Sequence, residues 1–96
     1  MSDAVIRVLI VDDQLLMRDG LVSLLSIQPG IEVVGTADNG EEAITATADL
    51  LPDVVLMDVR MPMMDGIEAT AEIHRRFPEI KVLMLTTFDD EAYVTG

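Results

Sequence analysis

Three aspartates and one threonine of this chain stand where short apolar runs end. Asp12 and Asp13 directly follow the first run, Asp58 ends another, and Thr86 comes after the last. Carboxylates are the ligands that a hard cation such as Mg²⁺ takes from proteins, and an aspartate can attack a phosphoryl group to give an acyl phosphate. Each aspartate taken alone is also a common turn residue or helix cap. Whether the four residues form one site depends on the fold that positions them.

The apolar runs alternate with helical patterns along the chain. The runs are short and predominantly apolar, as is typical of strands buried on both faces: Val5–Val11, Ile31–Thr36, Val54–Met57 and Val82–Leu85. Between the runs, apolar residues recur at helical spacing until a proline stops each pattern. The first helix is expected over Leu15–Ser26, and the second and third helices are expected to end before Pro52 and Pro78.

Two helix starts carry the pattern of a capping box, in which the cap and the residue three places on exchange hydrogen bonds. Asn39 is followed by Glu42, and Asp65 is followed by Glu68. On the third helix, three residues are expected to point inward: Ile67, Ala71 and Phe77. His74, on the same helix, is expected at the surface and away from the strand ends.

Alternating strands and helices predict a parallel sheet with helices on both faces and right-handed crossovers. Asp89–Asp90 indicates the start of a fourth helix after the last strand. Ligands of such sheets bind beyond the carboxyl ends of the strands. With the strand order 2-1-3-4, the first and third strands are neighbours, so the three aspartates and Thr86 converge at one rim. Close carboxylates repel one another, and Mg²⁺ would relieve that repulsion.

Composition narrows the classes of function. The 96 residues are enough for one domain, and the formal net charge of −12 comes from 18 acidic and 6 basic residues. This excess argues against nucleic-acid binding by the segment itself. It suits a domain that binds cations or basic partner surfaces, or it simply keeps the chain soluble. No cysteine, signal-peptide pattern or membrane-length apolar stretch occurs, so we expect a cytoplasmic protein without membrane contact.

The motifs taken together resemble the receiver domain of two-component response regulators. They are Asp12–Asp13, Asp58, the stretch Met61–Gly66 and the stretch Leu85–Thr87. The wording of residues 65–70 and 85–90 is similar to the NarL/FixJ (LuxR-like) subfamily, whose receivers precede a helix-turn-helix output domain. The resemblance covers the entire chain and implies a flavodoxin-like (CheY-like) three-layer α/β/α fold with a parallel sheet.

The resemblance also assigns roles to individual residues. Asp58 would accept a phosphoryl group from a sensor histidine kinase. Asp13 and Asp58 would bind Mg²⁺ directly, Asp12 would act mainly through water, and the backbone carbonyl of Arg60 would be a further ligand. Thr86 would turn its hydroxyl to the phosphoryl oxygen and carry the switch. A domain of this kind is a signalling phosphoacceptor and not a turnover enzyme.

The sequence departs from the family pattern at its C-terminal side. The resemblance implies a fifth strand, a lysine after it and a fifth helix, none of which the 96 residues contain. Lys81 opens the fourth strand at the wrong end of the sheet and cannot replace that lysine. We therefore interpret residues 1–96 as a receiver domain that stops before its fifth strand. The exposed edge predicts a homodimer or a segment-exchanged oligomer, and DNA binding is expected only through an absent output domain.

Three other functions are alternatives to this one. A magnesium-dependent phosphatase with an aspartate nucleophile usually needs a second aspartate two residues later, where this chain has Arg60. A nucleotide-binding domain needs a glycine-rich phosphate loop, and the sequence has neither a GxGxxG nor a Walker-type run. The strongest rival is a phosphorylation-incompetent receiver-like module that acts through protein–protein contacts. The intact aspartates and Thr86 count against it, and the missing lysine counts for it.

Overall fold

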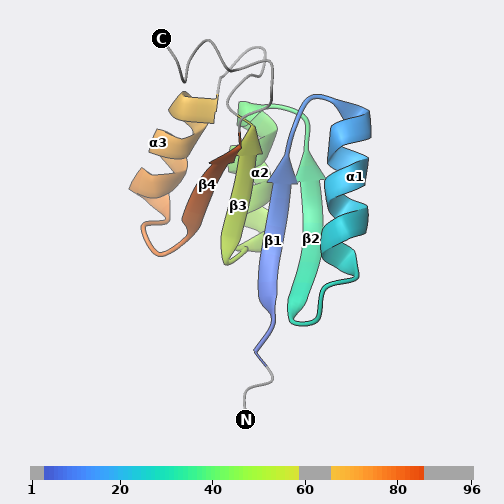
Figure 1. Ribbon diagram of the computed structural model, residues 1–96. Helices are drawn as coiled ribbons and strands as arrows, with labels where there is room; N and C mark the ends of the chain where they lie inside the picture. Colours follow the sequence, from blue (N-terminus) through green and yellow to red (C-terminus); the bar gives the residue numbers. More distant parts are fainter. Residues whose placement is uncertain (1–3, 59–65, 86–96) are drawn as a thin grey trace, which may run out of the picture.

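The computed structural model describes residues 4–58 and 66–85 as strands, helices and their connections (Figure 1). The elements are β1 (Ile6–Val11), α1 (Leu15–Ser26), β2 (Ile31–Ala37), α2 (Gly40–Leu50), β3 (Val54–Asp58), α3 (Gly66–Arg76) and β4 (Lys81–Leu85). The predicted alternation is confirmed over these ranges. The Asp65 cap and the helix expected at Asp89–Asp90 lie outside the described residues.

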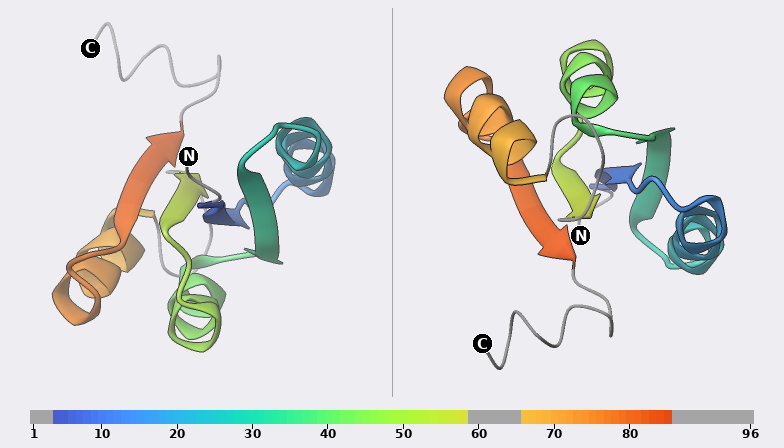
Figure 2. Two further views of the ribbon diagram at one scale, coloured as in Figure 1. Left: turned by 90° about the horizontal axis from the view of Figure 1, so that it is seen from below. Right: turned by 90° about the horizontal axis from the view of Figure 1, so that it is seen from above.

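The four described strands form one parallel sheet in the predicted order, β2-β1-β3-β4. Helix α1 covers one face beside β1 and β2, and helices α2 and α3 cover the other face, which gives three layers (Figure 2). Val11 of β1 is in register with Met57 of β3. The residues that follow these two positions, Asp12 and Asp58, therefore leave the sheet at the same edge.

The hydrophobic core is centred on β1 and on the sheet face under α2 and α3. Four consecutive residues of β1 are buried, which explains the almost continuous apolar run in the sequence: Val8, Leu9, Ile10 and Val11. Val55 and Met57 of β3 and Ile73 of α3 are fully buried against them. The two strands that supply the site edge are thus the best-packed part of the sheet.

The periphery is covered less. No residue of α1 is buried, and Leu16 in its first turn is 87% exposed. On β4, Leu83 is 53% exposed and Met84 is 37% exposed. The apolar side chains expected at helical spacing on α1 are therefore covered only in part: Leu21 and Leu25 are half-buried, whereas Met17 and Leu24 are exposed.

The predicted inward face of α3 is wrong in its phase. Ile67 is 65% exposed, and Ala71 is exposed as well. The buried positions are Gly66, Ala69 and Ile73. Phe77, just beyond the helix, is half-buried as predicted. Small residues at 66 and 69 let the helix lie close to β3 and β4, and this close approach, not the largest apolar side chain, fixes which face turns inward.

Candidate metal and phosphoacceptor site

Two aspartates with different surroundings, Asp12 and Asp13, follow the end of β1. Asp12 is 3% exposed, and its backbone N–H donates to the Ala37 carbonyl at the end of β2, at 3.1 Å. Its carboxylate Oδ1 accepts a hydrogen bond of 2.8 Å from the backbone N–H of Gln14. Asp13 is exposed to solvent. Asp12 therefore has the turn role that is common for an aspartate at such a position. Its carboxylate supports the start of α1, where the cap residue Gln14 makes no side-chain hydrogen bond.

The third aspartate, Asp58, is the last residue of β3. Asp58 is 5% exposed and is in register with Leu85 of β4. One carboxylate oxygen from each of Asp12, Asp13 and Asp58 lies within 4.8 Å of the others. Two of the carboxylates are buried and one is exposed. The structure thus brings together the three aspartates that the sequence singled out, at the edge predicted for them.

The spacing of these oxygens has a chemical consequence. Three negative charges at such distances repel one another by about 1 kcal/mol per pair even in water, and by more where water is excluded. A divalent cation among them turns this repulsion into attraction. The donor set is made of oxygens only, which suits the hard cations Mg²⁺ and Ca²⁺ rather than thiolate- or imidazole-seeking metals.

Gly66 holds helix α3 close to this edge. A Cβ atom at this position would meet the carbonyl oxygen of Asp58, and it would lie 3.1 Å from Met57 Cγ and 3.1 Å from Met84 Cε. Only glycine lets the first turn of α3 contact the backbone of the third aspartate this closely. Sequence analysis treated Gly66 as part of a motif and missed this role, which depends on a contact between the start of helix α3 and strands β3 and β4.

A second residue that sequence analysis missed is Arg18. It lies in the first turn of α1 and forms an ion pair with Asp38, which lies between β2 and α2. No spacing rule pairs these positions, because one lies in helix α1 and the other in the loop between β2 and α2. The ion pair spans the two connections that flank Asp12.

The remaining predicted site residues have different outcomes. Thr86 and Arg60, expected to supply the switch hydroxyl and a carbonyl ligand, lie outside the described residues. His74 is exposed on α3, as predicted. It lies toward the end of a helix whose start, at Gly66, contacts the backbone of Asp58.

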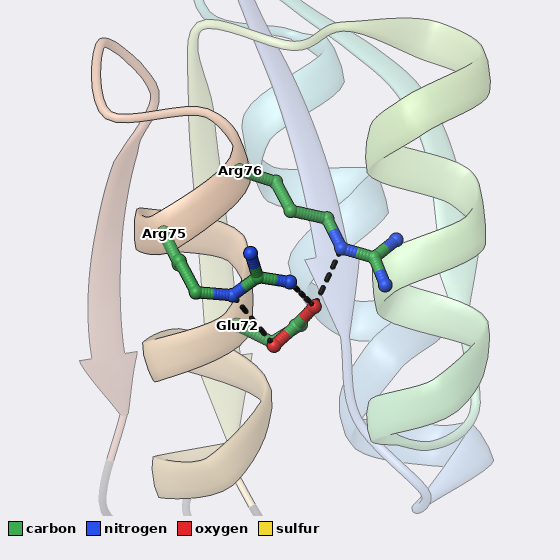
Figure 3. Close-up of polar contacts among 3 residues, drawn as sticks. All are labelled: Glu72, Arg75 and Arg76. Carbon is green, nitrogen blue, oxygen red and sulfur yellow. Dashed lines mark hydrogen bonds and ion pairs between the residues drawn. The ribbon is translucent and has the colours of Figure 1, made fainter.

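A separate charge cluster occupies the far half of α3 (Figure 3). Glu72 accepts hydrogen bonds from Arg75 and Arg76, each with a shortest distance of 2.5 Å. The hydrogen bond from Arg75, with that from Arg76, holds the pKa of Glu72 below its ordinary value. The same carboxylate raises the pKa of Arg75. Both ion pairs of Glu72 are thus formed within α3, with residues three and four positions further along the helix.

The comparisons with known proteins agree with this fold and site. A family model described as the response regulator receiver domain matches residues 8–96. The chain therefore belongs to the response regulator receiver domain family. The predicted resemblance, including its NarL/LuxR-like character, is confirmed, and so is the CheY-like, flavodoxin-like fold.

Relatives with curated names are substantially longer than this chain. The transcriptional regulatory protein LnrK of Bacillus subtilis is 48% identical over 89 residues, which are 93% of this chain and 40% of LnrK. The response regulator protein VraR of Staphylococcus epidermidis is 52% identical over 90 residues, which are 92% of this chain and 43% of VraR. The chain thus spans about two fifths of the length of these two relatives.

Among solved structures, the signal receiver domain of the putative response regulator NarL from Mycobacterium tuberculosis superposes with a TM-score of 0.82. It is 39% identical, and the match covers 96% of this chain and 74% of that one.

In the part of the chain that the structure describes, no helix has the length and apolar character needed to cross a membrane.

Proposed function

We propose that this chain is the phosphoacceptor domain of a two-component response regulator, and that a sensor histidine kinase phosphorylates it on Asp58 in an Mg²⁺-dependent reaction. The observation that carries the proposal is the convergence of the Asp12, Asp13 and Asp58 carboxylates within 4.8 Å at the carboxyl edge of the sheet. Family membership supports the same reading. The domain is proposed to span residues 1–96.

The three aspartates suit different parts of this task. Asp13 and Asp58 would bind Mg²⁺ directly, because Mg²⁺ takes few carboxylates and keeps water or phosphate oxygens as its other ligands. Asp12 has one carboxylate oxygen engaged by the Gln14 N–H, which favours the role through water expected for it. The Arg60 carbonyl remains the proposed further protein ligand. When bound, Mg²⁺ would neutralise the negative charge that gathers at the site during transfer.

The proposed chemistry is an in-line displacement at phosphorus. A carboxylate oxygen of Asp58 forms a bond to phosphorus, the bond from phosphorus to the kinase histidine nitrogen breaks, and that nitrogen recovers a proton. The product is an acyl phosphate on Asp58. The protein's contribution is position and charge, and burial of Asp58 in a well-packed strand end supplies the first of these.

Phosphorylation would then act as a signal. A phosphoryl group adds negative charge and strong acceptor oxygens at the strand ends, which can bias a two-state surface. Thr86 is the proposed reader of that group. The relatives are named as transcriptional or response regulators, which supports a helix-turn-helix, DNA-binding output in the whole protein. The proposal includes a signalling role without substrate turnover and a cytoplasmic location.

The exposed apolar periphery supports the predicted self-association. Leu16 of α1 and Leu83 of β4 are more than half exposed, and both belong to elements at the margins of the described fold. A homodimer or a segment-exchanged oligomer would bury such surface. This part of the proposal is independent of the phosphorylation chemistry.

Intact-mass spectrometry after incubation with Mg²⁺ and acetyl phosphate tests the proposal. One added phosphoryl group is expected on the wild-type chain and none on Asp58→Asn. Asp49→Asn, which removes an exposed carboxylate from α2, is the matched control and should be phosphorylated like the wild type. Absence of any mass change in the wild type would contradict the proposal and favour the interaction module that works through protein contacts alone.

A further inference from the structure

Arg18 is a poorly exposed cation next to an acidic edge. Its backbone N–H donates to the Gln14 carbonyl at 2.9 Å, which places it in the first turn of α1. Its side chain is 16% exposed, although arginine normally keeps its guanidinium in water. That guanidinium forms an ion pair with Asp38, whose side chain is 60% exposed. The arginine side chain of this pair is therefore mostly buried, whereas the aspartate side chain faces solvent.

Asp38 is itself held in place by the start of α2. The Asp38 N–H donates to Glu42 Oε1 at 2.9 Å, and the Glu42 N–H donates to Asn39 Oδ1 at 2.9 Å. Half of the predicted exchange is present: the Glu42 N–H donates to Asn39, but the Glu42 carboxylate accepts from Asp38, the residue before the cap, and not from Asn39. The residue on the other side of Asp38 is Ala37, whose carbonyl accepts from the Asp12 N–H. Asp38 is therefore an anchor set between α2 and the metal-site edge.

The ion pair closes a ring of contacts around Asp12. The Asp12 backbone binds Ala37, its carboxylate binds the Gln14 N–H, and Arg18 joins the helix that starts there to Asp38. Two links thus join the segment from Asp12 to the first turn of α1 to the end of β2 and the residue that follows it. One link is a backbone hydrogen bond, and the other is the ion pair.

The placement of Arg18 also differs from that of the other described cations. Arg7 lies near the start of β1, and its guanidinium donates to the Leu51 carbonyl. Lys81 is the first residue of β4. Arg75 and Arg76 lie at the end of α3 and bind Glu72 (Figure 3). Among the lysine and arginine residues within 4–58 and 66–85, only Arg18 lies at the carboxyl edge of the sheet.

We propose that Arg18 is a positioning residue for the metal site: its ion pair with Asp38 holds the loop that carries Asp12 and Asp13 against the loop after β2, so that the aspartates stay convergent before a cation arrives. This inference rests on the proposed Mg²⁺ site. Carboxylates brought together without a cation push their loops apart. A link that resists this separation lowers the cost of ordering the site and raises metal affinity.

The sign of the mutational effect separates this role from a simple charge effect. If Arg18 acts only through its field, removing its positive charge tightens Mg²⁺ binding, whereas removing the negative charge of Asp38 weakens it. If the two residues act as a link, either loss weakens binding. The double variant then binds no more weakly than the weaker single variant, because one interaction has been removed in each case.

Calorimetric titration of the purified chain with Mg²⁺ alone is the experiment. Arg18→Gln and Asp38→Asn are each expected to raise the Kd by about 3- to 10-fold, at the lower end of what outer partners of metal ligands contribute. Arg18→Lys, which keeps the charge, is expected to recover part of the loss. Arg75→Gln removes an arginine of the same charge from the α3 cluster and is expected to leave the Kd unchanged.

Urea unfolding in the presence of EDTA accompanies each titration, so that loss of folded protein is not mistaken for loss of affinity. A wild-type chain that binds Mg²⁺ only as weakly as Asp58→Asn overturns the proposed function, and this inference with it. A wild-type chain that binds normally, beside an Arg18→Gln variant that binds equally or more tightly, overturns the inference alone. A fall in affinity that merely follows the unfolded fraction also overturns it.

Discussion

Away from the carboxyl edge of the sheet, the acidic side chains of Asp53 and Glu72 lie against hydrogen-bond donors, whereas at that edge three carboxylates also lie close to one another. Asp53, just before β3, accepts from the Arg7 N–H at 2.9 Å, and Glu72 accepts from two arginines. At the carboxyl edge, oxygens of the three aspartates are within 4.8 Å. Charges of the first kind stabilise the fold, while charges of the second kind oppose it until a cation binds.

Packing differs between regions in a complementary way. The repelling aspartates follow β1 and β3, whose ends are fully buried at Val11 and Met57. The half-covered elements, α1 and β4, carry exposed apolar side chains. The electrostatic cost of the site is thus placed beside the best-buried part of the sheet, whose packing can hold unfavourable groups in position. The margins keep surface that a partner can cover.

The largest expected effect comes from disturbing the packing that supports the site. Gly66→Ala should destabilise the chain by about 2–3 kcal/mol, because the new methyl group meets the Asp58 carbonyl and two methionine side chains. The matched variant is Gly20→Ala in α1, where no atom lies within 4 Å of the added Cβ. That change should stabilise by about 0.5–1 kcal/mol through helix propensity. Urea unfolding measures both, and equal effects would show that the contact at Gly66 carries no weight.

A smaller effect is expected from removing one carboxylate of the aspartate cluster or the carboxylate of the α3 cluster. Asp13→Asn should raise the unfolding free energy in EDTA by about 1 kcal/mol, because it relieves repulsion within the cluster. The same variant should lose most of the added stability that Mg²⁺ gives the wild type. Glu72→Gln should lower stability in EDTA and keep the Mg²⁺ response, because its carboxylate is paired with arginines. Urea unfolding with EDTA and with Mg²⁺ measures these signs. The same sign for both variants in EDTA would remove the contrast between the two clusters.

Much of this contrast was predictable from the sequence, because it depends on period and position. The continuous apolar run of β1 gave a strand buried on both faces, and parallel order brought Asp12, Asp13 and Asp58 to one edge. What failed was the phase of α3, where Ile67 was expected inside and is 65% exposed. Periodicity finds a helix, but contacts with β3 and β4 choose its inward face.

The two missed residues share a different reason. The contact of Gly66 with Asp58 joins two separate elements, and the pair of Arg18 with Asp38 joins helix α1 to the loop after β2. The register of β1 on β2 also shifts between Val8 and Leu9, so the position of Ala37 beside Asp12 does not follow from counting residues. Such contacts are set by tertiary geometry and leave no local pattern in the sequence.

The smallest expected effect is the pH dependence of the Glu72 cluster. Because its arginine partners hold the pKa of Glu72 below the ordinary value of 4.5, the folded state releases this proton more readily than the unfolded state. The cluster's contribution to stability is therefore fully present above pH 4.5, and it is lost as the pH falls through the lowered value. The measurement is the difference in unfolding free energy between the wild type and Glu72→Gln, taken from neutral to acidic pH. The difference should favour the wild type at neutral pH and shrink in acid, with modest size because the pair is on the surface and screened by salt. A difference that stays constant through the acidic range would mean that the two arginines do not stabilise the ionised carboxylate, and the opposition between paired and converging charges would then rest on the aspartates alone.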